Sequence, residues 1–290
     1  MSILIDKNTR VMVQGITGRA GLYHTRRMVA YGTNVVAGVV PGRGGSEVDG
    51  IPVYDSVQEA AEAQHPDAPI LVVPPLYTRD GLTEALASGI RLIVPIAEGV
   101  PILDMQRIYH LNRAFPASRI IGPNSFGVIS PGKSKIGFME DRIFSPGPVG
   151  LMSRSASNSY EAVNALTAAG LGQSTCVGIG GDVIPGSTFA DLLPLFEEDE
   201  ETKVIVLIGE IGGYDEEEAA ERIRSEVSKP VVAYVAGKNA PVGKKMGHAG
   251  AIIDSSGAGS AEAKLASLEA AGAHIAGSLA EIAEIVRRLL

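Results

Sequence analysis

The sequence has no tryptophan, a single cysteine and only 5% aromatic residues among its 290 residues. One cysteine, Cys176, excludes an internal disulfide and a zinc site built from several cysteines. We expect it to be a buried, reduced thiol in the apolar run 174–178. No run reaches the ~20 apolar residues of a membrane span, and residues 1–7 lack the apolar core of a signal peptide. The sequence therefore predicts a soluble, cytoplasmic protein without a membrane segment or a metal site.

The sequence also has no excess of basic residues. There are 25 Lys and Arg against 33 Asp and Glu, a formal net charge of −8, which argues against nucleic acid as the main ligand. The chain is instead rich in hydrophobic residues (45%) and contains 35 glycines. A core of aliphatic side chains favours parallel sheets covered by helices over an aromatic-rich β-sandwich.

Short β-branched runs alternate with longer amphipathic stretches along the chain, which is the pattern of βαβ units. The predicted strands are residues 11–15, 34–40, 70–74, 91–96, 119–122, 149–153, 174–178, 204–209, 230–236 and 251–254. The clearest helical segments are residues 22–31, 56–63, 78–88, 160–169 and 278–290. The segment Ser145-Pro-Gly-Pro148 interrupts this alternation. We therefore predict an α/β protein with two doubly wound domains, residues 1–145 and 146–290.

A glycine-rich loop follows the first predicted strand and contains Gly15, Gly18 and Gly21. Such a loop at the start of a helix exposes backbone N–H groups and a partial positive charge, which suit phosphate. The spacing is not Gly-x-Gly-x-x-Gly, and the second strand ends at Pro41 without a ribose-binding acid, which counts against a nicotinamide-dependent dehydrogenase. The alternative is a loop that only packs the helix. A second flexible loop, residues 41–45, carries one cation.

One of the five histidines, His248, lies in a glycine-rich segment, after Lys244 and Lys245 and between Gly247 and Gly250. No helix or strand periodicity explains its position, so we predict a nucleophilic imidazole on an exposed loop. The alternative is an incidental loop histidine. The other histidines are expected to be surface or packing residues.

Two polar segments accompany this histidine. Glu210 lies among glycines at the carboxyl end of the strand 204–209, where it could accept the Nδ1–H of His248 and leave Nε2 free; otherwise it is a turn residue facing solvent. The segment 153–161 leads from a strand into a helix, and Asn158 with Glu161 fits a capping box. Its N–H groups could bind a phosphoryl group, although ordinary capping explains it equally well, and Tyr160 could be a core residue.

Taken together, the motifs of this chain resemble those of succinyl-CoA synthetase alpha subunits, in the same order and over essentially the whole length. They are Thr17-Gly18 with Gly21, Pro41-Gly-Arg-Gly-Gly45, Glu98-Gly-Val-Pro101, Gly122-Pro-Asn124, Ser153-Arg-Ser155, Gly178-Ile-Gly-Gly-Asp182, Gly209-Glu-Ile-Gly-Gly213 and Gly247-His-Ala-Gly250.

The resemblance implies an α/β fold with a Rossmann-like CoA-binding domain followed by a flavodoxin-like ligase domain. It implies a partner beta subunit, in an αβ or α₂β₂ complex, whose ATP-grasp site binds ATP or GTP with Mg²⁺. His248, oriented by Glu210, would carry a phosphoryl group to a small carboxylic acid, and CoA would take the acyl group. The implied CoA contacts are Thr17, Gly18, Arg19, Ala20, Arg43, Ile96, Ala97 and Glu98. The implied substrate and phosphate contacts are Asn124, Ser155, Ala156, Ser157, Asn158 and Tyr160.

The chain departs from the family pattern at three places. Arg43 replaces the usual lysine, and Ser125-Phe-Gly127 replaces Cys-Pro-Gly. Ala156-Ser-Asn158 replaces Gly-Thr-Leu, which adds polar groups where phosphoryl and carboxylate should meet. One hypothesis is an acid more polar than succinate, such as malate, a citrate-like or a sulfonated acid; the other is neutral drift in a succinate enzyme. A non-catalytic CoA-binding regulatory protein is the main alternative, but it would be expected to lose His248 or Glu210.

Overall fold

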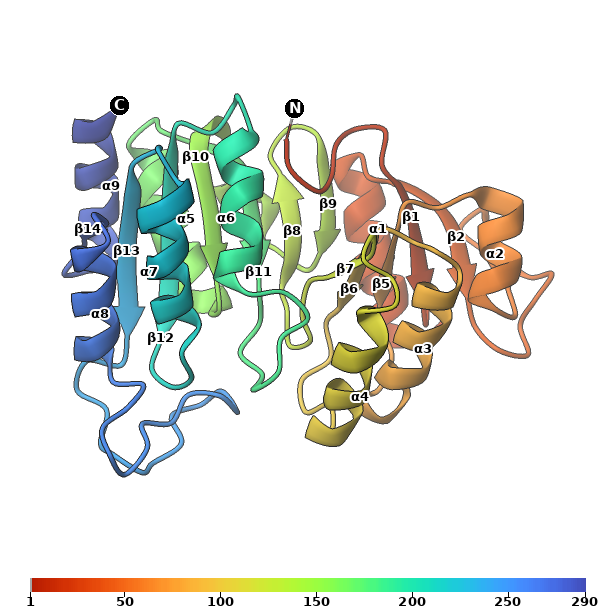
Figure 1. The fold of residues 1–290 in the computed structure, drawn as a ribbon. Coiled ribbons are helices and arrows are strands. Elements are labelled where there is room, and N and C mark those ends of the chain that lie inside the picture. Colours follow the sequence, from red (N-terminus) through yellow and green to blue (C-terminus); the bar gives the residue numbers. More distant parts are fainter. Residues whose placement is uncertain (1) are drawn as a thin grey trace.

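The computed structural model describes residues 2–290, which form two sheets lying side by side (Figure 1). The first sheet has the strand order β3-β4-β2-β1-β5-β6-β7 and is parallel apart from the β3–β4 pair. Its strands are β1 (Arg10–Gln14), β2 (Asn34–Val39), β3 (Glu47–Val48), β4 (Ile51–Tyr54), β5 (Ala68–Leu71), β6 (Leu92–Pro95) and β7 (Arg119–Ile120). Its helices are α1 (Arg19–Tyr31), α2 (Val57–Gln64), α3 (Pro75–Ala87) and α4 (Ile102–Asn112).

The second sheet has the order β14-β13-β12-β10-β11-β8-β9, and only the hairpin β8–β9 runs antiparallel to its neighbours. Its strands are β8 (Gly127–Ser130), β9 (Ser134–Gly137), β10 (Pro146–Ser153), β11 (Gln173–Gly178), β12 (Val204–Glu210), β13 (Val231–Ala236) and β14 (His274–Ile275). Its helices are α5 (Ala156–Ala168), α6 (Phe189–Glu198), α7 (Asp215–Glu226), α8 (Ala261–Ala270) and α9 (Leu279–Leu289), with a 3₁₀ turn η1 (Asp141–Ile143).

The core is aliphatic, as the composition predicts. Every residue of β11 and β12 is buried, which requires cover on both faces of the sheet. Helices α6, α7 and α8 lie on the face toward the viewer in Figure 1, and α5 packs against α9. Cys176 is fully buried in β11, and burial raises the pKa of its thiol, so the prediction of an inert core cysteine is confirmed. Within residues 2–290 no helix has both the length and the apolarity to cross a membrane.

The structure differs from the sequence-based expectations at three places. Hairpin β8–β9 belongs to the second sheet, so by sheet membership the chain changes units between Ile120 and Gly127, before the boundary predicted at residue 145. The strand expected at residues 251–254 is absent, because these residues belong to the irregular segment 237–260. Helix α5 starts at Ala156 rather than 160 and is capped by Ser155, so the capping box of Asn158 with Glu161 was wrong.

Candidate active site

The centre of the site is a hydrogen bond between His248 and Glu210. Glu210 is the last residue of β12 and is 6% exposed, whereas His248 lies on the long irregular segment 237–260, at the lower edge of Figure 1. Nδ1 of the imidazole is 2.6 Å from Oε2 of the carboxylate. This hydrogen bond raises the pKa of His248, and burial of the ring opposes the rise. With Glu210 as acceptor, Nδ1 carries the proton and Nε2 is the nitrogen that remains free to react.

The His248 ring packs against a glycine-rich loop. A Cβ on Gly181, in the loop after β11, would overlap the His248 ring, so this position must remain without a side chain. The N–H of Gly250 donates to the carbonyl oxygen of Gly181 at 3.2 Å, and the N–H of Gly212 donates to the carbonyl oxygen of Gly259 at 2.7 Å. These bonds hold the histidine segment, next to His248 and near its C-terminal end, to the loops after β11 and β12, with the ring over the Gly181 loop.

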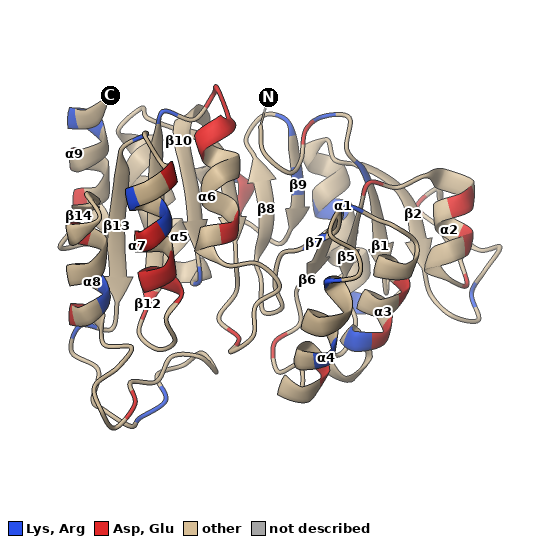
Figure 2. Cartoon of the chain, in the orientation of Figure 1, with Lys and Arg blue, Asp and Glu red and all other residues tan. Residues whose placement is uncertain are grey.

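A buried guanidinium lies behind this pair. Arg154 follows β10, is 4% exposed, and its Nε is 3.2 Å from Oε1 of Glu210, an ion pair without hydrogen-bond geometry. Its Nη1 donates to Asp215 at 2.7 Å, and its Nη2 donates to the carbonyl oxygen of Asp182 at 2.9 Å. Figure 2 shows the start of α7 in red, because acidic residues, among them Asp215, make up its first turn. In the sequence, nothing distinguishes Arg154 from an ordinary polar residue except its place at the centre of Ser153-Arg-Ser155.

The first glycine loop has the geometry expected of an anion site. Gly15 has φ +83°, and a Cβ on Gly21 would overlap the carbonyl oxygen of Gly15, so the turn into α1 needs both glycines. Helix α1 begins at Arg19 with Gly18 as its N-cap, and no side chain caps it. Residues 17–20 are all exposed. The first N–H groups of the helix are therefore free to bind a phosphate.

Four arginines lie on or near the two glycine-rich loops, Arg19, Arg26, Arg27 and Arg43, and two of them are already paired with carboxylates. Arg26 pairs with Asp49 at 2.7 Å, and Arg27 pairs with Asp141 at 2.6 Å. Arg19 and Arg43 form no ion pair within residues 2–290, and both are exposed on the loops that the sequence analysis selected.

The second predicted CoA segment reaches the histidine. The N–H of Asn124 donates to the carbonyl oxygen of Ala97 at 2.9 Å, and a Cβ on Gly180 would overlap the carbonyl oxygen of Pro123. After the hydrogen bond to Glu210, the negative charge of Glu98 also contributes to the raised pKa of His248. Glu98, in the segment expected to contact CoA, therefore lies close enough to His248 for its charge to act on the imidazole.

Unpartnered polar atoms mark the same place. Nδ2 of Asn124 and Oδ1 of Asp182 are buried and have no hydrogen-bond partner within residues 2–290. Burial also raises the pKa of Asp182. The Asn124 side chain opposes this rise, so the two side chains face each other, although their geometry is not that of a hydrogen bond.

The third predicted segment starts α5. Ser155 accepts the N–H of Asn158 at 3.4 Å, and its hydroxyl is 3.3 Å from that of Ser157. Tyr160 packs at the edge of the second core cluster, with its ring centroid 6.1 Å from that of Phe126. Burial raises the pKa of Tyr160 to about 12. Ser155 thus directly follows Arg154, which pairs with Glu210, and the structure favours the packing interpretation for Tyr160.

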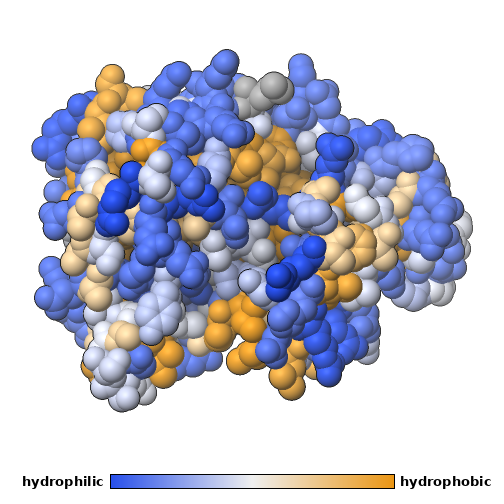
Figure 3. Space-filling view, viewed as in Figure 1, coloured by the Kyte–Doolittle hydropathy of each residue, from blue (hydrophilic) through white to orange (hydrophobic). Residues whose placement is uncertain are grey.

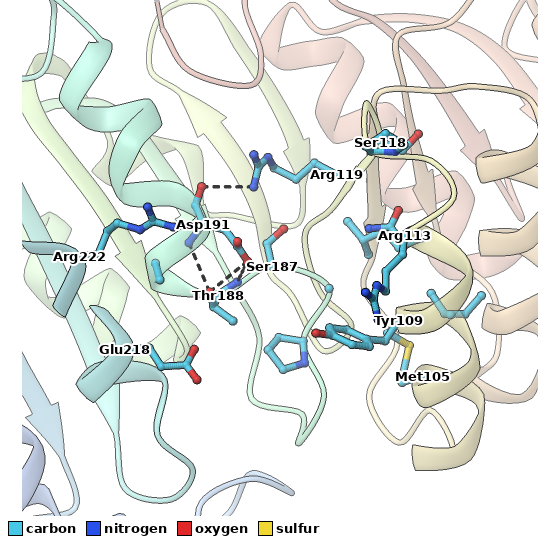
Figure 4. A pocket seen from close by; sticks show the side chains of 17 residues that line it. Met105, Tyr109, Arg113, Ser118, Arg119, Ser187, Thr188, Asp191, Glu218 and Arg222 are labelled. Atoms are coloured by element: carbon cyan, nitrogen blue, oxygen red, sulfur yellow. Dashed lines mark hydrogen bonds between the residues drawn. The ribbon is translucent and has the colours of Figure 1, made fainter. Parts of the chain in front are cut away.

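A separate groove lies between α4 on one side and α6 and α7 on the other (Figure 4). Its volume is about 820 Å³, and Nη1 of Arg119 donates across it to the carbonyl oxygen of Asp191 at 3.3 Å. Arg113 and Arg222 also line it. None of the predicted site residues lines this groove, so the groove is distinct from the predicted site.

Comparisons with known proteins agree with this geometry. Residues 6–99 match the family described as CoA binding domain, and residues 152–274 match the family described as CoA-ligase. The chain is 53% identical over 290 residues to subunit alpha 1 of the ADP-forming succinate–CoA ligase of Archaeoglobus fulgidus, covering 100% of this chain and 99% of that protein. The chain belongs to the succinate–CoA ligase alpha-subunit family. It is also 50% identical to the corresponding subunit alpha of Aquifex aeolicus, covering 100% of this chain and 95% of that one.

Among solved structures, the chain is similar to ATP citrate lyase from Methanothrix soehngenii in complex with citrate and coenzyme A. The TM-score is 0.89 at 29% identity, covering 99% of this chain but 50% of the lyase chain. This chain therefore spans about half the length of the lyase chain. The likeness confirms the predicted order of the two units, a Rossmann-like CoA-binding unit followed by a doubly wound ligase unit.

Proposed function

We propose that this chain is the catalytic alpha subunit of an NDP-forming acid–CoA ligase, in which His248 is transiently phosphorylated. The observation that carries the proposal is the 2.6 Å hydrogen bond between Nδ1 of His248 and Glu210 at the end of β12. The family membership and the two matched domains support the class of reaction.

In the first step, Nε2 of His248 attacks the γ-phosphorus of a nucleoside triphosphate. A P–N bond forms, the bond to the β-phosphate oxygen breaks, and the diphosphate leaves. The positive charge that develops on the imidazole is balanced by Glu210, which accepts the hydrogen bond from the protonated Nδ1. The N-terminus of α5 at Ser155 offers N–H groups to the phosphoryl oxygens.

In the second step, a carboxylate oxygen of the acid attacks the phosphorus, and the P–N bond breaks. The phosphoryl group turns a poor leaving group into a good one. In the third step, the CoA sulfur attacks the acyl carbon, the thiol proton is lost, and inorganic phosphate leaves. Segment 96–98 would hold the CoA thiol close to His248, because Glu98 lies near enough to affect the histidine charge.

The N-terminal unit would bind CoA itself. Thr17, Gly18, Arg19 and Ala20 surround the start of α1, where free N–H groups suit the pyrophosphate. Arg43 on the second loop supplies a second unpaired cation for a phosphate. Arg26 and Arg27 have no part in this proposal, since both already pair with carboxylates.

A beta subunit would supply the nucleotide. The sequence has no Gly-x-x-x-x-Gly-Lys-Ser/Thr loop, and the relatives are named as alpha subunits. An ATP-grasp domain with Mg²⁺ is what the family resemblance implies for the partner. Figure 3 shows apolar surface at the lower edge of the molecule, and the exposed apolar side chains of the chain include Leu103 (66%) and Val183 (49%). This edge also carries the histidine segment, and exposed apolar surface there suits a docked partner.

The acid is a small dicarboxylate or a related polar acid. The relatives are named for succinate. In this chain Ser157 and Asn158 lie in the first turn of α5, directly after the cap residue Ser155. Their polar side chains add hydrogen-bonding capacity beside the place where phosphoryl and carboxylate would meet, which favours an acid with an additional polar group such as malate.

The test uses the chain co-expressed with its beta subunit. We would add γ-labelled ATP or GTP, measure acid-labile label on His248, and chase it with CoA and a panel containing succinate, malate, citrate and a sulfonated acid. We expect label that is lost in His248→Ala. A kcat/KM highest with succinate would reject the polar-acid hypothesis and leave neutral drift. A folded, CoA-binding protein that never accepts label would favour the non-catalytic regulatory alternative.

A further inference from the structure

Arg154 is a buried cation at the centre of the site with no role in the mechanism above. We propose that Arg154 is a positioning residue for phosphoryl transfer: it holds Glu210 against His248 and limits how strongly that carboxylate attracts the imidazole proton. This inference rests on the proposed function of His248 as the phosphoryl acceptor.

The first argument is geometric. The guanidinium contacts three segments that are far apart in sequence: Glu210 at the end of β12, Asp215 at the start of α7, and the carbonyl oxygen of Asp182 in the loop after β11. Each of these segments bears on the histidine. Glu210 binds Nδ1, and the Asp182 loop includes Gly181, over which the ring is seated. A planar cation with several fixed donors can hold all three, which a lysine cannot.

The two carboxylate oxygens of Glu210 therefore contact two different residues. Oε2 is 2.6 Å from Nδ1 of His248, and Oε1 is 3.2 Å from Nε of Arg154. A second anchor stops the carboxylate from rotating away from the imidazole. A carboxylate shared with a guanidinium also has less negative charge to offer the histidine.

The charges that face His248 come from every element packed against it. They are Glu210 on β12, Glu98 after β6, Asp182 after β11 and Arg154 after β10. Asp215 on α7 pairs with Arg154, and Lys244 and Lys245 are exposed on the histidine segment itself. The carboxylates stabilise the protonated imidazole. Arg154 is the buried cation among them and acts in the opposite direction, lowering the pKa of His248 that the hydrogen bond to Glu210 raises. It thereby keeps neutral imidazole available for attack.

Removing this cation should shift the pH dependence of His248 phosphorylation in one direction. In Arg154→Met the imidazole proton is held more tightly, so the acid limb of the phosphorylation rate should move to higher pH by about one unit, the lower end of what a nearby charge does. On the acid side of the profile, the labelling rate of Arg154→Met relative to the wild type should therefore be about tenfold lower than the same ratio at high pH. Arg154→Lys keeps the charge but not the three contacts. The acid limb of the pH profile of Arg154→Lys should stay near that of the wild type, while its labelling rate should fall at every pH.

The experiment measures single-turnover labelling of His248 by γ-labelled ATP from pH 5.5 to 9 in the co-expressed complex. The variants are Arg154→Met and Arg154→Lys. Arg222→Met is the matched control, because Arg222 lies on the exposed face of α7 and pairs with Glu226. CoA binding and the thermal midpoint are measured for each variant, since CoA contacts lie in the other unit and report intact folding.

The outcomes separate the two proposals. A wild-type complex that is never labelled on His248 refutes the proposed function. Normal labelling of the wild type, with Arg154 variants that match it in rate and in acid limb, refutes only the role of Arg154. A lowered midpoint without a change in the labelling of folded protein assigns Arg154 a purely structural role. If Arg154→Met fails to fold, an unchanged labelling rate in Arg154→Lys still overturns the inference.

Discussion

Removing one partner of the buried ion pair between Lys264 and Glu216 should strongly destabilise the ligase unit. Both side chains are 0% exposed, and they form a close salt bridge between α8 and α7. Oε1 of Glu216 accepts the N–H of Glu210 at 3.0 Å and packs against Gly209. The pair therefore supports the backbone that carries the partner of His248.

Lys264→Met would leave the Glu216 carboxylate buried without its counter-ion. Breaking such a pair costs about 3–5 kcal/mol. At roughly 2–4 °C per kcal/mol for units of this size, the thermal midpoint should fall by about 10 °C. The double variant Lys264→Met with Glu216→Gln should recover part of the loss, because no unpaired charge is then buried.

Lys135→Met provides the matched control. Lys135 is also buried, at 1% exposure of its side chain, but its partner Asp141 is 3.5 Å away, 23% exposed, and retains Arg27 at 2.6 Å. Its loss should therefore leave no carboxylate without a partner. We expect Lys264→Met to be more destabilising than Lys135→Met by at least about 2 kcal/mol in urea unfolding at pH 7.

The pH dependence has a definite sign. Burial raises the pKa of Glu216, so the folded state holds this proton more tightly than the unfolded state. A charged Glu216 therefore costs stability above the ordinary pKa of glutamate, and the cost disappears as the pH falls. In Lys264→Met the deficit against the wild type should be smaller at pH 5 than at pH 7. Equal losses for Lys264→Met and Lys135→Met, or a deficit that grows toward pH 5, would refute this reasoning.

Three further changes probe the site. Glu210→Gln removes the charge that raises the pKa of His248, so the acid limb of labelling should move to lower pH while the rate falls about 10–100-fold, as for other partners that orient a histidine; a limb that stays in place would contradict the assignment. Gly181→Ala should abolish labelling with CoA binding intact, because its Cβ would overlap the His248 ring; labelling at the wild-type rate would show that the ring sits elsewhere. Ser155→Ala removes the cap of α5, whose bond is 3.4 Å long, and should cost about 0.5–1 kcal/mol in urea unfolding, less than a short cap would; a loss above about 2 kcal/mol would indicate a further role.

Local patterns in the sequence were sufficient for the fold class and for part of the site. Alternating apolar runs predicted the parallel strands, because side-chain periodicity is a property of neighbouring residues. The glycines around His248 indicated an exposed loop for the same reason, and the structure confirms that loop. The order of the motifs indicated the family, which the comparisons confirm.

Only the tertiary structure decided which residues meet. Glu210 and His248 are 38 residues apart, and their 2.6 Å contact exists because β12 and the segment after β13 end at the same edge of the sheet. Arg154 looks like an ordinary polar residue in sequence, and its three partners come from three different segments. The hairpin β8–β9 joins the second sheet by pairing with β11, which no local pattern before residue 145 could indicate. Periodicity reports on neighbours in the chain, whereas a site is made by elements that packing brings together.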